Sequence, residues 1–201
     1  MSRIVPWDQR IAQCLVRPLV NTPIRPNHIT MLTVVLALTG AGLLSSIDSV
    51  LLNWGAGIFV LSRFLDHFDG ELARQGGQTS RLGYLLDYFA GGLSYAALFA
   101  CMAYGQYQGW LGPSALLLGA AGSVCALIAV WLNLQIDALN GDGEDAVGYP
   151  ALAGFELEDG IYLLAPVTWT GWLSEFYVLA CCGAVVYLFW TLSCLMRQRA
   201  Q

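Results

Sequence analysis

Residues 66–74 read DHFDGELAR and residues 83–87 read GYLLD, and these two segments decide how the 201-residue chain folds. They lie where two very apolar segments meet. Their aspartates are therefore placed at or near the depth of a bilayer core, where ionisable groups are costly and usually functional. This placement predicts that the two segments form neighbouring helices whose acidic faces meet.

Three aspartates of these segments would point at one place. Asp66 and Asp69 share a helix face because they are three residues apart, and Asp87 lies on the next helix. Acids that close repel strongly in a low dielectric, and a bound cation is the natural relief. An all-oxygen ligand set suits Mg²⁺, Mn²⁺ or Ca²⁺ rather than zinc. Asp66, Asp69 and Asp87 are therefore the predicted metal ligands.

Small residues accompany the acids on the same helix faces. Gly70, Ala73 and Gly83 remove side-chain bulk and leave room beside the metal for a ligand such as a phosphate. The alternative is that small residues only let the helices pack closely, while the acids pair with the nearby arginines, Arg63, Arg74 and Arg81. That alternative explains one acid and one arginine well, but it explains three clustered acids poorly.

The pattern resembles the motif of the CDP-alcohol phosphotransferases, also called CDP-alcohol phosphatidyltransferases. Their motif is Asp-x-x-Asp-Gly-x-x-Ala-Arg, eight or nine residues, then Gly-x-x-x-Asp-x-x-x-Asp. This chain matches in type and spacing at Asp66, Asp69, Gly70, Ala73, Arg74, Gly83 and Asp87. At the last position it has Gly91. In the family, the acid at that position helps to hold a second metal and is regarded as the base for the attacking hydroxyl.

The resemblance implies a transferase of phospholipid biosynthesis. A phosphoalcohol or phosphatidyl group would pass from CDP-diacylglycerol or a CDP-alcohol to a lipid or polar alcohol acceptor, with release of CMP. The Pro-Asn-x-Ile-Thr sequence resembles the family's entry to its first span, where polar residues lie beside the nucleotide. The residues expected to hold the donor are Asn27, Thr30, Asp66, Gly70, Ala73, Arg74, Arg81 and Gly83. The resemblance also implies a homodimer, and no nucleic-acid partner is expected.

Composition indicates a polytopic membrane protein. The chain is 57% hydrophobic and only 11% charged, with a mean hydropathy of +0.59, whereas about a quarter of the residues of a soluble domain are charged. One domain is expected over residues 1–201, without a cleavable signal peptide. The six cysteines form no CxxC motif and are interpreted as packing residues.

An all-α fold with six transmembrane helices is predicted, because six apolar segments approach the about 20 residues that a bilayer core requires. The fifth segment is short and contains Pro166. Residues 3–20 alternate arginine with large apolar residues and predict an amphipathic helix at the membrane surface; a helix packed on the protein itself is the alternative. Asn27 is the predicted N-cap of the first span. The six segments are about 28–45, 50–73, 81–104, 113–136, 158–173 and 175–196.

Arginines predict the orientation. All nine basic residues are arginines, and six spans place both termini on the side that carries them. The loops on the other side, near residues 46–49, 105–112 and 174, contain none. By the positive-inside rule, both termini and the acidic motif are cytoplasmic, in an inner membrane. The motif would then be reached by a nucleotide from the cytosol.

Because Gly91 has no carboxylate, another residue would have to act as the base of the reaction. No Asp, Glu or His lies between Asp87 and Asp137, so a replacement must come from farther away. Asp87, Glu156 and Asp159 are the predicted catalytic residues, although the acids at 156–159 could instead provide favourable charge at a helix N-terminus. The full set of candidates for the missing base is Asp137, Glu156, Glu158, Asp159, His67 and Glu71.

Two other classes of function remain open. A non-catalytic nucleotide- or lipid-binding relative would have kept the metal ligands and lost the base. A transporter or channel with an acidic pathway is the other class, but it would not require the glycines, alanine and arginine at the family's spacing. CMP release from CDP-diacylglycerol with a divalent metal would distinguish a transferase from the non-catalytic relative. Liposome flux without CMP release would favour the transporter or channel.

Overall fold

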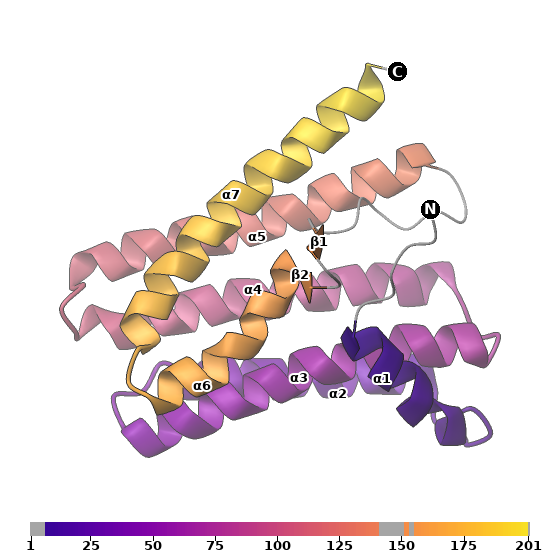
Figure 1. The fold of residues 1–201 in the computed structure, drawn as a ribbon, viewed down its shortest axis with the longest axis horizontal. Coiled ribbons are helices and arrows are strands. Elements are labelled where there is room, and N and C mark those ends of the chain that lie inside the picture. Colours follow the sequence, from indigo (N-terminus) through magenta and orange to yellow (C-terminus); the bar gives the residue numbers. More distant parts are fainter. Residues whose placement is uncertain (1–6, 141–150, 153–154, 201) are drawn as a thin grey trace.

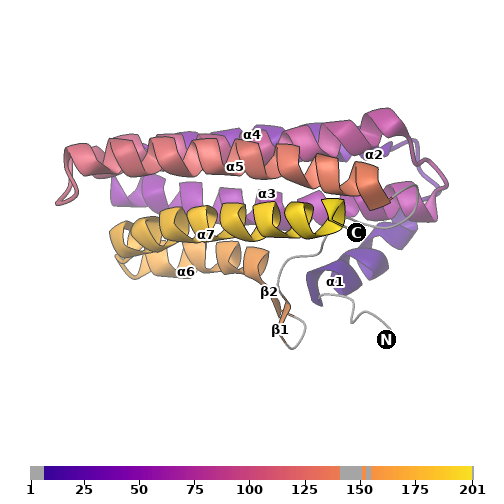
Figure 2. The ribbon, with the colours of Figure 1, turned by 90° about the horizontal axis from the view of Figure 1, so that it is seen from above.

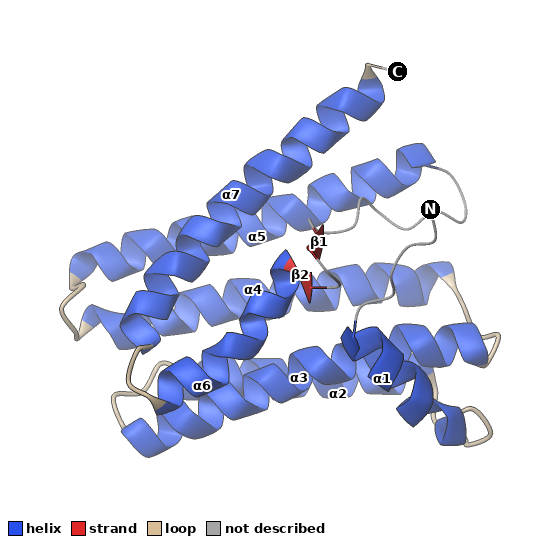
Figure 3. Ribbon diagram, in the orientation of Figure 1, coloured by secondary structure: helices blue, strands red, loops and turns tan. Residues whose placement is uncertain are grey.

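The structure is a computed structural model, and it describes residues 7–140, 151–152 and 155–200. The regular secondary structure of the described residues is helical except for one antiparallel pair of two-residue strands (Figure 3). Its elements, in chain order, are α1 (Trp7–Val16), η1 (Arg17–Leu19), α2 (Pro26–Leu43), α3 (Ser49–Gln75), α4 (Arg81–Tyr107), α5 (Pro113–Asn140), β1 (Ala151–Leu152), β2 (Phe155–Glu156), η2 (Leu157–Leu163), α6 (Leu164–Trp169) and α7 (Leu173–Arg199).

The long helices form one bundle around an apolar core. Helices α3, α4 and α5 run nearly along one direction, and α7 crosses α5 obliquely (Figure 1). Seen from above, α6 and α7 lie on one side of the bundle and α4 and α5 on the other (Figure 2). The core combines side chains of α2 to α7, among them the fully buried Leu44, Phe59, Leu98, Met102 and Tyr177.

Helices α2 and α3 touch through their backbones. A Cβ at Gly40 would lie 2.7 Å from the backbone nitrogen of Phe59 and 2.8 Å from the carbonyl oxygen of Gly55. A Cβ at Gly55 would lie 2.8 Å from the carbonyl oxygen of Gly40. Small residues at such crossings allow close approach of helices in membranes. This contact fixes α2 beside the acidic segment of α3.

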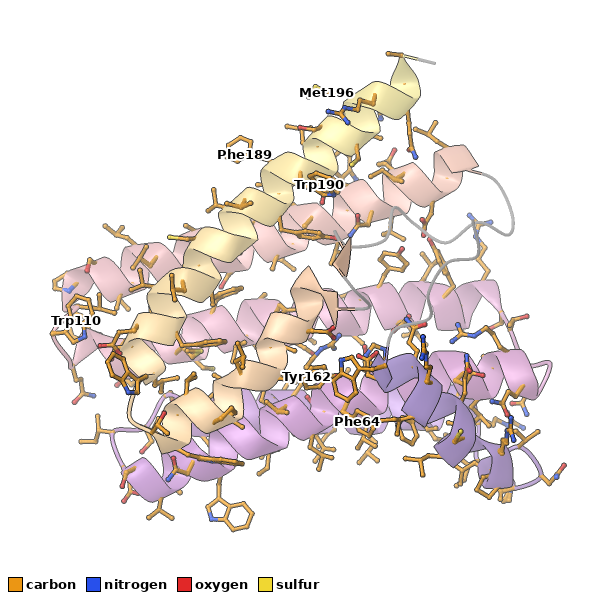
Figure 4. The ribbon with its side chains drawn as sticks, in the orientation of Figure 1. Phe64, Trp110, Tyr162, Phe189, Trp190 and Met196 are labelled. Carbon is orange, nitrogen blue, oxygen red and sulfur yellow. The ribbon has the colours of Figure 1, made fainter. Side chains whose placement is uncertain are left out.

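Four of the described helices are long and apolar enough to cross a membrane, namely α2, α4, α5 and α7. Large apolar side chains cover their outer faces, and Phe189 and Met196 project outward from α7 (Figure 4). Helix α3 has the same length as α4, but it carries the charged motif near one end. The prediction of an all-helical membrane protein is confirmed, and the count of six spans stays a prediction.

The predicted span at 158–173 is wrong as a continuous helix. The structure divides it into the 3₁₀ segment η2 and the six-residue α6, and Gly171 with φ +83° ends it. Pro166 is tolerated in α6 because it occupies the first turn, where its missing N–H needs no helical partner. Buried Leu164 and Thr168 attach α6 to the bundle.

The predicted N-cap at Asn27 is also wrong. Helix α2 begins at Pro26, so Arg25 is the cap residue, and its N–H donates to Nδ1 of His28 over 3.3 Å. Proline is favoured at the first helical position because its φ is already helical and it lacks an N–H. The side chain of Asn27 instead faces the start of α4, where a Cβ on Gly83 would lie 3.4 Å from Asn27 Oδ1.

Helix α1 packs on the protein through one face. Asp8, Ala12 and Val16 are four residues apart and buried, and the two apolar ones join Phe68 and Leu72 of α3. On the other side of α1, Ile11 and Leu15 are exposed. The alternative of a helix packed on the protein therefore holds for the first face. Membrane contact of the second face stays a prediction.

Candidate metal centre

The structure brings together the three aspartates that the sequence predicts as metal ligands. Asp66 and Asp69 come from α3 and Asp87 from α4, and one carboxylate oxygen of each lies within 4.8 Å of the others. Asp69 is buried, Asp66 is half-buried and Asp87 is the most accessible. Three carboxylate oxygens at this separation form a donor set that suits a hard divalent cation.

Hydroxyl groups of α2 orient the two aspartates of α3. The Thr30 hydroxyl donates to Asp69 Oδ2, and the Thr33 hydroxyl donates to Asp66 Oδ1 over 3.4 Å. The Gly70 N–H donates to Asp69 Oδ1 over 2.6 Å. Such partners fix the orientation of metal ligands. Thr30 therefore contacts a predicted ligand directly, whereas the sequence placed it only beside the nucleotide.

An arginine of α3 pairs with one of the three aspartates. Arg63 is buried, its Nη2 lies 3.0 Å from Asp66 Oδ2, and its guanidinium stacks on the Tyr95 ring at 5.0 Å. Arg74 pairs instead with Glu71 over 2.9 Å. Three carboxylates and one guanidinium leave a charge of −2 when all are ionised. The pairing with arginine thus neutralises one acid, and the remaining charge fits a divalent cation.

The small residues of the motif lie around this centre. A Cβ at Gly70 would lie 3.4 Å from Arg74 Nη1, and one at Gly83 would lie 3.1 Å from Ser80 Oγ. Arg81 begins α4 and is exposed, and Ala73 is half-buried. Gly91 differs from Gly70 and Gly83, because a Cβ there would have no neighbour within 4 Å. The position of the missing acid therefore faces open space.

Asp159 does not join the three aspartates. It lines a small pocket with Asp8, Arg63, His67 and Tyr162. Arg63 also contacts Asp66, so this side chain connects the pocket to the metal centre. The side chains of Glu156 and Glu158 lie outside the described residues.

A pair between α1 and α3 was missed by sequence reasoning. Asp8 Oδ2 lies 2.8 Å from His67 Nε2 and accepts a hydrogen bond of 3.0 Å from the Tyr162 hydroxyl. Tyr162 lies beside α1 (Figure 4), and its ring meets Trp7 at 5.2 Å. Burial alone would raise the pKa of Asp8, but His67, the Gln9 N–H and Tyr162 outweigh it and hold the pKa below its ordinary value.

Asp8→Asn is expected to loosen α1 from the bundle. A hydrogen bond to a charged group contributes about 1.5–3 kcal/mol, so the variant should unfold at a lower temperature at neutral pH. Because the pKa of Asp8 is lowered in the fold, its contribution is complete above the unfolded-state pKa and is lost as the pH falls through the folded-state value. Thermal unfolding in detergent, with the exposed Glu175→Gln as control, should show the difference shrinking under acidic conditions. An equal difference at every pH would contradict the assignment.

The other candidates for the base already have partners. His67 contacts Asp8, and Glu71 accepts hydrogen bonds from Arg74 and from Gln75. Asp137 lies between α5 and α4, where its Oδ2 accepts hydrogen bonds from two tyrosine hydroxyls. Sequence reasoning named Asp137 as a candidate but gave no indication of those tyrosines.

Comparisons with known proteins identify similar folds and the family of the chain. No curated protein matches the sequence. The fold is similar to that of phosphatidylinositol phosphate synthase (PgsA1) of Mycobacterium tuberculosis in its CDP-DAG-bound structure, with TM-score 0.70, 19% identity and coverage of 92% of this chain and 94% of that one. The structure of that protein with manganese and citrate gives TM-score 0.70, 18% identity and coverage of 92% and 88%. At this identity the likeness shows the fold alone.

The family follows from the sequence itself. The family model described as CDP-alcohol phosphatidyltransferase matches residues 23–140, which is more than half of the chain. This range contains the whole motif and the three convergent aspartates. The chain therefore belongs to the CDP-alcohol phosphatidyltransferase family.

Proposed function

We propose that the protein is a membrane-embedded, divalent-metal-dependent transferase. It moves a phosphoalcohol or phosphatidyl group from a CDP-linked donor to the hydroxyl of an alcohol and releases CMP. The observation that carries the proposal is the convergence of Asp66, Asp69 and Asp87 within 4.8 Å, at the spacing of the family motif. The similar mycobacterial protein was solved with CDP-DAG bound, which supports a lipid-linked donor.

The metal centre would be formed by the three aspartates, with Mg²⁺, Mn²⁺ or Ca²⁺ as the ion. A divalent ion in such a site neutralises charge on the donor's diphosphate. The similar protein was solved with manganese, which supports this choice. In this chain, Thr30 and Thr33 orient the carboxylates, and Arg63 holds Asp66. Phosphoryl transfer depends mainly on such positioning and charge neutralisation.

The donor would lie against the ends of α2, α3 and α4. The side chain of Asn27 faces Gly83 there, and its amide would hydrogen-bond the base or the ribose of the donor. Arg74 and Arg81 have accessible guanidinium groups that suit phosphate oxygens. Gly70 and Ala73 leave space beside the aspartates. These residues form the proposed binding site for the donor.

The sequence assigns catalytic roles to Asp87, Glu156 and Asp159, and we keep Asp87 in the metal centre. Asp159 lines the pocket that contains Arg63, not the metal centre. For Glu156 the role stays a proposal.

The transferase function is tested by CMP release. Purified protein in detergent, given CDP-diacylglycerol, Mg²⁺ or Mn²⁺ and a panel of alcohols, is expected to release CMP, and EDTA is expected to stop it. Donor binding is measured in parallel by calorimetry. Gly91 favours a second candidate, a non-catalytic binding protein. Donor binding that requires metal, without CMP release for any acceptor, would establish that second function and contradict the first.

We also propose one domain over residues 1–201, a homodimer, and an inner membrane with both termini cytoplasmic. The oligomer is measured by light scattering in detergent. For the orientation, single cysteines are placed in a cysteine-free background at two exposed glutamines, Gln78 between α3 and α4 and Gln108 after α4. Gln108→Cys should react with an impermeant reagent in intact cells, and Gln78→Cys only after permeabilisation. The reverse result would place the metal centre outside the cell.

A further inference from the structure

Asp137 is held in one orientation by two tyrosines of α4. It lies near the end of α5, and its Oδ2 accepts hydrogen bonds from the hydroxyls of Tyr84 and Tyr88, the latter over 2.6 Å. The two tyrosines are one helical turn apart, and their ring centres lie 4.9 Å apart. Two donors on one oxygen fix the carboxylate plane and leave the second oxygen for another partner.

The second oxygen of this carboxylate has no partner in the described structure. Asp137 Oδ1 is buried and accepts no hydrogen bond, and no arginine of the described residues pairs with Asp137. Leaving a buried carboxylate oxygen without a donor costs its full desolvation free energy. The site therefore suits a ligand that brings a hydrogen-bond donor, such as a hydroxyl group.

This carboxylate lies on the side of α4 where the family motif is incomplete. Along the surface of α4, Gly91 falls between the direction of Asp87 and that of Tyr88, because it follows them by four and three residues. A Cβ at Gly91 would meet nothing within 4 Å. Position 91 thus faces open space, in a direction between that of the predicted metal ligand Asp87 and that of Tyr88, whose hydroxyl bonds Asp137.

We propose that Asp137 is the catalytic base that takes the role of the acid missing at position 91. This inference rests on the proposed transferase function. The acceptor hydroxyl donates to Asp137 Oδ1 and loses its proton to that carboxylate. The acceptor oxygen forms a bond to the phosphorus of the donor, the bond from phosphorus to the oxygen of CMP breaks, and CMP leaves with the electron pair. Tyr84 and Tyr88 are positioning residues.

Asp137→Asn removes the basic group and retains an oxygen that can accept from the tyrosines. Since a positioned base contributes typically about 10²–10⁴-fold, CMP release should fall at least about 100-fold. Binding of Mn²⁺ and of CDP-diacylglycerol, measured by calorimetry, should stay unchanged. Glu175→Gln, which also removes one carboxylate but at an exposed place on α7, is the matched control and should keep full activity.

A second variant tests whether the two positions exchange roles. Gly91→Asp, added to Asp137→Asn, should restore CMP release at least about tenfold, because the new carboxylate enters the open space beside Asp87. Activity of Asp137→Asn within threefold of the parent protein overturns the base role and leaves the transferase function intact. Loss of donor binding in that variant shows a structural role and also overturns it. A parent protein that binds donor without releasing CMP overturns the transferase function, and the base role with it.

Discussion

Asp87→Asn is expected to remove divalent-metal binding from the protein. Asp87 is the most accessible of the three convergent aspartates, so the substitution takes away a charged ligand with little effect on packing. Removal of even an outer partner of a metal ligand typically costs about 10–100-fold in affinity. Loss of the ligand itself should therefore weaken Mn²⁺ binding by at least about 100-fold, and donor binding should fall with it. Calorimetry in detergent measures both.

Two comparisons make the result specific. Asp66→Asn and Asp69→Asn should show the same loss, although Asp69 is buried and bonded to Thr30, so its variant should also unfold at a lower temperature. Asp48→Asn removes a carboxylate from the other end of α3, where it caps the helix, and should leave Mn²⁺ binding unchanged. Unchanged Mn²⁺ and nucleotide affinity in all three motif variants would refute the metal centre.

Gly40→Ala should prevent normal folding. The added methyl group would lie 2.7 Å from a backbone nitrogen and 2.8 Å from a backbone oxygen of α3, and neither atom belongs to a flexible side chain. Overpacking a core typically costs about 1–3 kcal/mol, and a clash with two backbone atoms of α3 should exceed that range. The yield of monodisperse protein and the unfolding temperature in detergent are the measurements.

Gly42 supplies the control on the same helix. It is exposed, and a Cβ there would have no neighbour within 4 Å. Gly42→Ala should raise the unfolding temperature slightly, because alanine is favoured over glycine by about 1 kcal/mol inside a helix. Equal behaviour of the two variants would show that the contact between α2 and α3 is looser than the structure indicates.

The convergence of the three aspartates could be predicted from the sequence because helical spacing determines which residues share a face. Asp66 and Asp69 are on one face of α3 for that reason, and Asp87 comes near them because α3 and α4 both pack against α2. Capping was predicted less well. Asn27 has the side chain of a good N-cap, but Pro26 is also favoured at the first position of a helix and determines where α2 begins. The prediction considered Asn27 alone and therefore placed the start of the helix too late.

Contacts between distant parts of the chain could not be predicted. Asp8 is 59 residues from His67, and Asp137 is 49 residues from Tyr88. No local pattern links such pairs, because each depends on how two helices pack. The partners of Asp137 bear on function, since they leave Oδ1 without a donor. The sequence could name this carboxylate as a candidate for the base, but only the fold shows how it is held.

The division of η2 and α6 has a consequence for biogenesis. Seven 3₁₀ residues and six α-helical residues rise only about 23 Å, which is less than the about 30 Å of a bilayer core. During synthesis this segment is therefore a poor substrate for independent insertion by the translocon. We expect it to enter the membrane together with α7, as a hairpin closed at Gly171, and to gain a stable place only when buried Leu164 meets helices already inserted. In ribosome-bound chains truncated before α7, a cysteine in this segment should thus react with a reagent added on the side of the membrane where the ribosome lies.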